Sequence, residues 1–386
     1  MGIKKLQVYQ GFEQGPIRPP SEANSLLIRI TRNCPWNRCT FCSAYKQQRF
    51  SLRPVDHIIR DIDAIFRVID VVLSDLSGRG QLSQERLNTL AHRHFADDLQ
   101  VFNIAINWLA RGEGSVFLQD ANSLIIKPHD LIPILEHLKK RFPWITRVTS
   151  YARSHTINRI SGENLTRLAQ AGLNRVHIGM ESGCDEVLEK VDKGVTREHH
   201  ITAGQAVKKA GIELSEYVMP GLAGRDLSSD HALHTADALN QINADFIRLR
   251  TLAISQDIPL YEDYQSGTFR KCTDLEIVSE IHQFVSALTG ITSTLVSDHF
   301  YNLLQGVEGR LPQDKPGMLA VLERFLQLPQ HEKSLFQLGR RLGYFQSLED
   351  LQPGAQRTGA ESVYERLAVS PDNVDLIVEK YMLKAF

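Results

Sequence analysis

Three cysteines within nine residues, near the start of the chain, are its clearest chemical group. Cys34, Cys39 and Cys42 form a C-x4-C-x2-C pattern, and only two further cysteines lie elsewhere in the 386 residues. The pattern follows the apolar, β-branched run 26–31 and contains a proline, so we expect a loop leaving the end of a strand. Three thiolates on such a loop can converge on one point.

Four kinds of structure could use three such thiols. Structural zinc requires four ligands in a closed tetrahedron, but the nearest downstream candidates, His57 and Cys184, are not at zinc-finger spacing. A disulfide with a spare thiol, or a buried thiol cluster, would need no metal. A four-iron cluster held by three cysteines leaves one iron open to a substrate or cofactor. The local spacing leaves these alternatives open.

Composition and charge are those of an ordinary globular protein. Apolar residues make up 42% and charged residues 23%, and 44 basic residues face 45 acidic ones. This balance gives no overall field that would attract nucleic acid or an anionic membrane. No apolar run is long enough to span a bilayer and the first ten residues carry no signal-peptide core, so we expect a cytoplasmic protein. Five cysteines, mostly in one loop, suit a reducing compartment.

Strands and helices alternate along the middle of the chain. We expect six strands, at 26–31, 115–118, 145–151, 175–180, 212–218 and 245–253. Apolar strands separated by single helices predict a parallel sheet, because each crossover needs a helix packed on the sheet. Such units wind right-handed and can curve into a partial or full (β/α) barrel.

The whole chain is expected to have four parts. These are an irregular N-terminal segment (1–24), an α/β barrel domain (25–255) with a helical insertion near 77–112, a connecting, barrel-closing segment (256–312) and a C-terminal helical cap (313–386).

Polar residues follow successive predicted strands. They are Asp120 and Asn122, Arg153, Glu181 to Cys184, and Pro220, Gly221 and Gly224. In parallel sheets the carboxyl ends of the strands share one edge, where ligands bind. Each residue alone has a simpler explanation as a helix cap, a surface ion pair or a turn. Together, behind a loop with three thiols, they favour a site.

In their order, these motifs resemble the radical S-adenosylmethionine (radical SAM) enzymes, in the branch of Elongator-type and methylthiotransferase-like catalytic domains. The resemblance rests on the cysteine loop with Phe41 before its last cysteine, on 117–122, on 175–183 and on Lys193-Gly194, and it extends over about 26–254. One departure is that four residues, where the family usually has three, separate the first two cysteines.

The resemblance implies a role for each matched residue. Cys34, Cys39 and Cys42 would hold a [4Fe-4S] cluster whose fourth iron binds S-adenosylmethionine. The cofactor contacts implied are Asp120, near Asn122, for the amino group, Glu181 and Ser182 for the ribose, Lys193 or Arg153 for the carboxylate, and Phe41, the backbone around Gly221 and Thr251 for the adenine.

The implied activity is reductive cleavage of S-adenosylmethionine to a 5′-deoxyadenosyl radical, which abstracts hydrogen from an unidentified organic substrate. A flavodoxin or ferredoxin type of protein would donate the electron, and the substrate would be a small or lipid-like molecule. Nucleic acid is not favoured, because the sequence shows no RNA-binding domain or basic tail. The alternative is a non-catalytic iron–sulfur or zinc protein that binds ligands or transfers electrons.

Two residues are candidates for a direct catalytic role. Cys184 follows a predicted strand end and could donate a hydrogen atom, although a small buried thiol is the commoner reading. His299, beside Asp298, could act as an acid or base, although a neutral histidine with its hydrogen bonds satisfied is commoner. The pair Arg340-Arg341 is expected on a solvated helix face.

Overall fold

The fold was obtained as a computed structural model that describes residues 8–16, 19–79, 83–111 and 114–382. The chain divides into two compact units that interleave in sequence. The first contains Met1–Pro35, Gln47–His177 and Lys209–Glu213, and the second contains Trp36–Lys46, Ile178–Lys208 and Leu214–Phe386. Each unit is described by itself.

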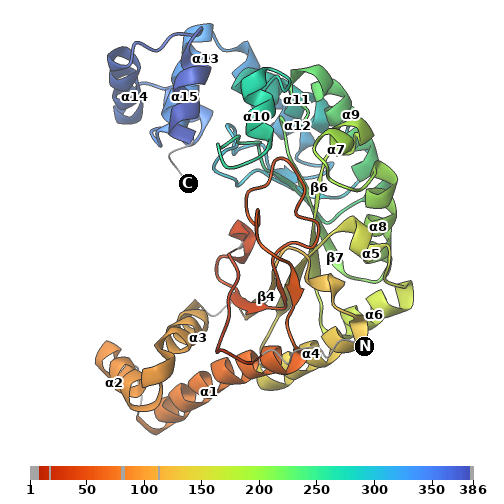
Figure 1. The fold of residues 1–386 in the computed structure, drawn as a ribbon. Helices are drawn as coiled ribbons and strands as arrows, with labels where there is room; N and C mark the ends of the chain where they lie inside the picture. Colours follow the sequence, from red (N-terminus) through yellow and green to blue (C-terminus); the bar gives the residue numbers. More distant parts are fainter. Residues whose placement is uncertain (1–7, 17–18, 80–82, 112–113, 383–386) are drawn as a thin grey trace. The chain divides into compact units, whose positions relative to one another are not determined.

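The main sheet is mostly parallel (Figure 1). Its strands, in sheet order, are β1 (Leu26–Arg29), β4 (Ser115–Gln119), β5 (Arg147–Ala152), β6 (Arg175–Glu181), β7 (Glu213–Val218), β8 (Phe246–Leu249), β9 (Thr294–Val296) and β10 (Gly309–Arg310). Within the units, β1–β4–β5 and β7–β8–β9 pair in parallel, and β10 runs antiparallel to β9. The predicted α/β class with a parallel sheet is confirmed. The strand order starts at β1 and ends at β10.

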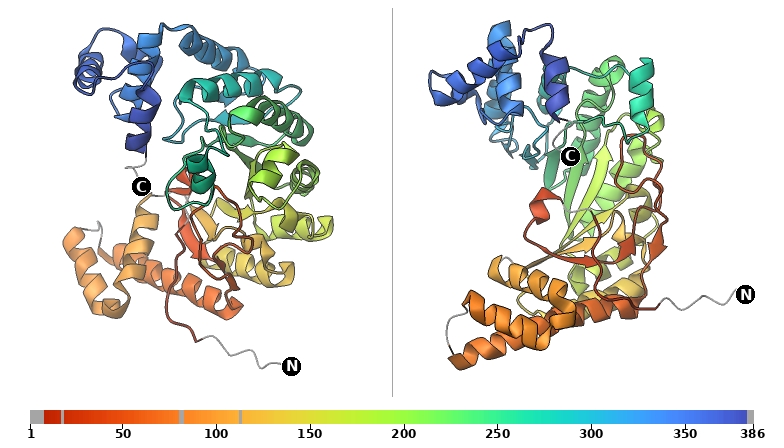
Figure 2. Two further views of the ribbon diagram at one scale, coloured as in Figure 1. Left: turned by 45° about the horizontal axis from the view of Figure 1, so that its top comes forward. Right: turned by 60° about the vertical axis from the view of Figure 1, so that its left-hand side comes forward.

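In the first unit, helices bury one apolar stripe each. Helix α1 (Val55–Arg79) places Ile58, Ile62, Ile65 and Ile69 at helical spacing, each at most 1% exposed. Burying side chains of this size stabilises the fold by about 1.5–3 kcal/mol apiece. The α1 helix packs on α3 (Leu99–Arg111) and α4 (Pro128–Arg141). Figure 2 shows α1, α2 (Gln84–His94) and α3 side by side, and of these α2 and α3 lie within 77–112, where a helical insertion was expected.

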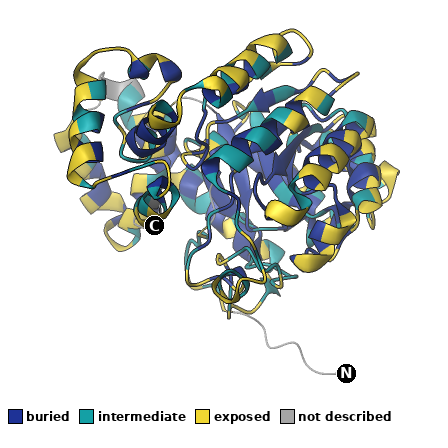
Figure 3. Ribbon diagram, turned by 90° about the horizontal axis from the view of Figure 1, so that it is seen from above, coloured by how far each residue is buried: buried dark blue, intermediate teal, exposed yellow. Residues whose placement is uncertain are grey.

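In the second unit, helices follow the strands and then continue alone. Helix α9 (Ser228–Ile242) packs on α11 (Asp274–Ala287), which also packs on α12 (Lys315–Gln327). The predicted helical segment is present as α12, α13 (Gln330–Arg341), α14 (Ala355–Arg366) and α15 (Val374–Met382). Figure 3 shows buried strands and helices that expose one face and bury the other.

Each of the six predicted strands is present, with shifted ends. The strand predicted at 245–253 stops at Leu249. Beyond it, Leu249 O and Thr251 N form hydrogen bonds with the Asn302 side chain instead of with a neighbouring strand. A bilayer-spanning helix, both long and apolar enough, does not occur among the described residues. The proposed domain boundaries stay predictions.

Candidate functional site

The cysteine loop connects two short paired strands, β2 (Thr31–Arg32) and β3 (Ser51–Leu52). None of the chain's cysteines forms a disulfide, and Cys34, Cys39 and Cys42 are all partly exposed. Among the described residues, no three His, Cys, Asp or Glu side chains cluster as ligands of a single metal ion. Around a four-iron cluster each cysteine binds a different iron, so cluster ligation by this loop stays a prediction.

Hydrogen bonds fix the loop within the second unit. The Trp36 indole Nε1 donates to the carbonyl oxygen of Asp192 at 2.7 Å, and the backbone N of Thr40 donates to Val191 O at 3.0 Å. A Cβ on Gly194 would lie 2.2 Å from the Trp36 ring, so only glycine allows this contact. The Lys46 ammonium donates to Cys39 O at 2.9 Å, which places a positive charge beside the loop.

In the first unit, Asp120 is completely buried and its carboxylate is already bound. Its Oδ2 atom accepts from Arg29 Nε at 2.8 Å and lies 2.7 Å from Arg29 Nη2. The same oxygen accepts the backbone N–H of Asn33 at 3.0 Å, directly before Cys34. Asp120 therefore anchors the start of the cysteine loop.

Two other predicted residues of the first unit meet. The Asn122 side chain is buried, and its Oδ1 accepts the backbone N–H of Arg153 at 3.1 Å while its Nδ2 donates to Thr156 Oγ1 at 2.8 Å. Asn122 thus ties the end of β4 to the end of β5.

In the second unit, Phe41, Glu181 and Lys193 come together. Lys193 Nζ lies 3.1 Å from Glu181 Oε1 and 5.5 Å from the centre of the Phe41 ring. Glu181 has a left-handed backbone, φ 63°, which is sparsely populated by residues other than glycine and is frequent at functional sites. Both charged side chains remain about one-tenth exposed, at 12% for Glu181 and 10% for Lys193.

Glu216 on β7 is a buried carboxyl without a partner. It is 0% exposed, and neither side-chain oxygen has a hydrogen-bond partner among the described residues. Burial, reinforced by the nearby Glu181 carboxylate and opposed by Lys193, holds the pKa of Glu216 well above its usual range. A buried acceptor of this kind needs a ligand or a proton.

Ser182 belongs to a buried polar network with two residues that the sequence did not single out. Its Oγ lies 2.8 Å from His231 Nδ1 on α9 and accepts the backbone N–H of Cys184 at 3.0 Å. His231 Nε2 lies 3.6 Å from Glu280 Oε1 on α11. Glu280 accepts the backbone N–H of Gly221 at 2.8 Å, so the network joins two predicted cofactor residues.

Burial shifts the titration of both new residues. Loss of solvation lowers the pKa of His231 to about 4, so the imidazole is neutral near pH 7. Loss of solvation raises the pKa of Glu280 to about 7, against the opposing hydrogen bonds from Ser228 and Gly221. A charged residue at a core position of an apolar helix is the signal that could have identified Glu280, which lies between Ile277 and Phe284.

Thr251 is held by Asn302, whose Oδ1 accepts from its backbone N at 3.0 Å and from its Oγ1 at 2.9 Å. The same loop contains His299, which is 8% exposed and accepts from Tyr301 N at 3.4 Å. Burial, Arg250 and Arg341 lower the pKa of His299 to about 3.

Arg341 is not on a solvated face. Its side chain is 3% exposed, because its guanidinium binds Tyr301 O and the carboxylate of Asp274, both at 2.7 Å.

Cys184 packs in an apolar cluster with Val187, Leu222 and Leu252 and is 4% exposed. This environment is that of a small buried side chain. A direct catalytic role for Cys184 or His299 stays a prediction.

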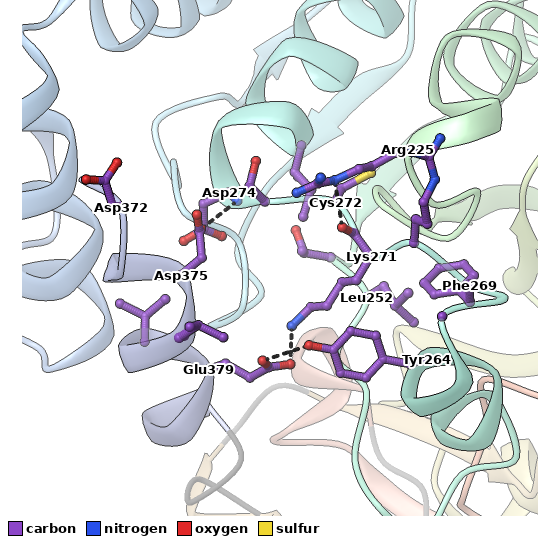
Figure 4. Close-up of a pocket in the computed structure, with 17 residues that line it drawn as sticks. Arg225, Leu252, Tyr264, Phe269, Lys271, Cys272, Asp274, Asp372, Asp375 and Glu379 are labelled. Atoms are coloured by element: carbon purple, nitrogen blue, oxygen red, sulfur yellow. Dashed lines mark hydrogen bonds and ion pairs between the residues drawn. The ribbon is translucent and has the colours of Figure 1, made fainter. Parts of the chain in front are cut away.

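A cavity of about 480 Å³ opens in the second unit between the chain after α10 (Leu260–Ser266), the start of α11, and α15 (Figure 4). We call it the α15 cavity. It is lined by Thr251 and Leu252, by the rings of Tyr264 and Phe269, and by charged residues that include Lys271 and Asp375. Its size lies within the range of small-molecule sites.

The residues fit an iron–sulfur cluster and a nucleotide cofactor in their donor chemistry. The loop offers three thiols free of disulfides, next to the backbone-bound ammonium of Lys46. The partly exposed pair Glu181–Lys193 and the unpartnered Glu216 supply further polar groups in the second unit.

Comparison with known proteins finds a family model that matches part of the chain. The model of the radical SAM superfamily matches residues 93–236. Over these residues the chain resembles the radical SAM superfamily. Members of this superfamily use a [4Fe-4S] cluster and S-adenosylmethionine, and these cofactors agree with the prediction. The matched residues include Glu181 and Ser182 and do not include the cysteine loop.

The individual relatives are distant in sequence. A tRNA uridine(34) acetyltransferase of Methanocaldococcus jannaschii is 25% identical over 120 residues, which are 31% of this chain and 22% of the relative. The 4′-phospho-dehydrooxetanocin synthase of Priestia megaterium is 27% identical over 198 residues, 49% of this chain and 22% of the relative. An archaeal Elp3 structure, from Methanocaldococcus infernus, has a TM-score of 0.40 at 17% identity and covers 52% of each chain.

The matched segments span less than a quarter of the length of these two curated relatives. The first relative supports the predicted resemblance to the Elongator-type branch.

Proposed function

We propose that this protein is an enzyme that cleaves S-adenosylmethionine reductively and abstracts hydrogen from an organic substrate. The observation that carries the proposal is the meeting of Phe41, Glu181 and Lys193 in the second unit, beside an unpartnered Glu216. Each of the first three was expected to bind S-adenosylmethionine. When bound, the cluster and S-adenosylmethionine supply one-electron cleavage of the sulfonium and a hydrogen-abstracting 5′-deoxyadenosyl radical.

We assign roles to the chain's own residues as follows. Cys34, Cys39 and Cys42 hold the cluster. Glu181 accepts from the ribose hydroxyls, and Lys193 neutralises the methionyl carboxylate. Phe41 lies against the adenine.

Two expected contacts are reassigned to positioning. Ser182 is fully buried and its hydroxyl is engaged by His231, so it holds the end of β6 rather than the ribose. Asp120, paired with Arg29, holds the cysteine loop.

The test uses protein reconstituted anaerobically with iron and sulfide. With dithionite and S-adenosylmethionine we expect 5′-deoxyadenosine, and we expect its loss in Cys34→Ala, Cys39→Ala and Cys42→Ala. Cys272→Ala is the matched control for cluster binding, because this thiol is buried outside the loop and its loss should leave the iron content unchanged. An intact cluster without cleavage would favour an electron-transfer or binding protein, and zinc in place of iron would exclude both iron-based functions.

A tRNA nucleoside is a second candidate substrate, because the first curated relative is a tRNA-modifying enzyme by name. The balanced charge of the chain, 44 basic against 45 acidic residues, does not favour nucleic acid. A gel shift with total tRNA decides between a tRNA substrate and a small-molecule substrate. Binding that weakens steeply with salt supports tRNA, and absence of a shift supports a small molecule.

A further inference from the structure

The charged residues of the α15 cavity are unequally paired. Each basic side chain in the lining has its own carboxylate, in the pairs Lys271–Glu379 at 2.6 Å, Arg225–Glu276 at 3.0 Å, and Arg270–Asp226. Among the described residues, no cation forms an ion pair with Asp375 or Asp372, which also line the cavity. The lining therefore contains carboxylates that no basic side chain of the lining neutralises.

Asp375 lies at the start of α15 and faces the start of α11. Its Oδ1 accepts from the backbone N of Asp274 at 3.3 Å (Figure 4). The same oxygen accepts from Gln337 Nε2 at 3.1 Å. These neutral donors hold the carboxylate in place without neutralising it. Burial and the Asp274 carboxylate raise the pKa of Asp375, against the two hydrogen bonds and the attraction of Lys271.

Asp274 supplies a second, independent observation. It is 7% exposed, and its Oδ1 is bound by Arg341, but its Oδ2 is buried without a hydrogen-bond partner among the described residues. Buried carboxylate oxygens are rarely left without a donor. Because Asp274 lines the cavity, a donor supplied from the cavity would complete it.

Part of the remaining lining is apolar. Leu252 and Ile277 form part of the wall, the rings of Tyr264 and Phe269 lie nearby, and Leu376 on α15 is 64% exposed at the cavity. A ligand that matches these surfaces has a hydrocarbon chain and one cationic donor. A carboxylate ligand would meet uncompensated like charge, and an alcohol would leave that charge unneutralised.

We propose that the α15 cavity binds a small molecule with a primary ammonium group on a short apolar chain, and that Asp375 and Asp274 Oδ2 accept from the ammonium. Thr251 lines the same cavity, so the ligand would lie beside a residue expected to contact S-adenosylmethionine. The assignment of this ligand as the substrate class of the enzyme rests on the proposed function. The preference of the cavity for an ammonium group does not.

Three probes of equal chain length test the preference: n-pentylamine, 1-pentanol and pentanoate, titrated calorimetrically into the full-length protein near pH 7. We expect saturable binding of pentylamine at one site, binding of pentanol at least about tenfold weaker, and no binding of pentanoate. Equal or tighter binding of pentanol or pentanoate would overturn the proposal.

Variants locate the site. Asp375→Asn should weaken pentylamine about tenfold or more and leave pentanol unchanged, because only the charge is removed. Leu376→Ala, at an exposed position that need not disturb folding, should weaken both probes equally. Glu262→Gln, an exposed acid on α10 outside the lining, is the control. Unchanged pentylamine affinity in Asp375→Asn would refute the assignment.

These titrations need neither reductant nor S-adenosylmethionine. A failed cleavage assay with selective pentylamine binding would therefore reject the proposed function alone. Cleavage without that selectivity would reject only the ammonium site.

Discussion

Asp120 at the end of β4 and Glu216 on β7 are both 0% exposed carboxyls, and their surroundings differ sharply. Asp120, in the first unit, is bound by the Arg29 guanidinium and by the backbone N of Asn33. Glu216, in the second unit, has no hydrogen-bond partner at either oxygen within the part of the chain that the structure describes, and it lies near a second carboxylate, Glu181. A buried carboxyl group thus has its hydrogen-bond partners in the first unit and lacks them, among the described residues, in the second.

The difference separates two uses of a buried acid. A carboxylate whose partners all come from the chain fixes the backbone, as Asp120 fixes the start of the cysteine loop. A buried carboxyl without partners costs stability and is retained where a ligand or proton completes it. By this criterion the second unit contains the groups that meet ligands.

The largest effect is expected from removing the partner of Asp120. Arg29→Met leaves a buried carboxylate without its cation and should lower the free energy of unfolding by about 3–5 kcal/mol, measured by urea denaturation. Arg60→Met is the control, because Arg60 and Asp56 form an exposed pair worth less than about 1 kcal/mol. Equal losses of unfolding free energy in the two variants would show that the buried Arg29–Asp120 pair stabilises the fold no more than an exposed pair does.

The buried network at Ser182 should show two opposing pH effects. The pKa of His231 falls from 6.5 to about 4 on folding, so its stabilising contribution is present above pH 6.5 and is lost as the pH falls through 4. The pKa of Glu280 rises from 4.5 to about 7, so its contribution is present below pH 4.5 and is lost as the pH rises through 7. Each amounts to something on the order of 3 kcal/mol.

Single substitutions separate the two contributions. In Glu280→Gln only the contribution of His231 remains, so the unfolding free energy should rise more steeply with pH than in the wild type between pH 4.5 and 6.5. In His231→Asn only the contribution of Glu280 remains, so the unfolding free energy should fall with pH over this range. Urea titrations at four pH values measure both slopes, and parallel curves for all three proteins would contradict the shifts.

Glu216→Gln tests the incomplete carboxyl directly. Since the pKa of Glu216 is raised on folding, its wild-type contribution is present below pH 4.5 and is lost as the pH rises through the folded pKa. The variant should match the wild type near pH 4 and be more stable by about 1–3 kcal/mol near pH 8. A variant less stable than the wild type near pH 8 would mean that the ionised carboxylate has partners.

Lys193→Met gives the smallest effect. Loss of the pair with Glu181 should cost about 1 kcal/mol near pH 7, because both side chains retain some exposure. Removal of the cation should also move the titration of Glu216 to higher pH, which is visible by NMR of the labelled side-chain carboxyl. An unchanged titration would separate Lys193 from Glu216.

Much of the architecture follows from local patterns. The apolar strands, the helices between them and the loop with three thiols depend on residues close in sequence, and their order carried the family resemblance. Phe41, Glu181 and Lys193 were each expected to bind cofactor, and they lie together because the ends of strands and the loops near them share one edge.

Long-range pairings were beyond the sequence. Arg29 and Asp120 are 91 residues apart, and nothing local marks them as partners. The link from Ser182 through His231 to Glu280 depends on how α9 packs on α11. Arg341 was expected in solvent, but it is buried by contacts with Tyr301 and Asp274, which are distant in sequence. Such contacts are set by tertiary packing, which a single sequence does not display.

The fixed indole of Trp36 gives the protein an intrinsic optical probe. Trp36 stands two residues after Cys34 and three before Cys39, and the chain has only two other tryptophans, Trp108 and Trp144. With both of those replaced by phenylalanine, the remaining emission would come from the cysteine loop. Iron–sulfur centres absorb where indole emits, so assembly could be followed in real time as quenching.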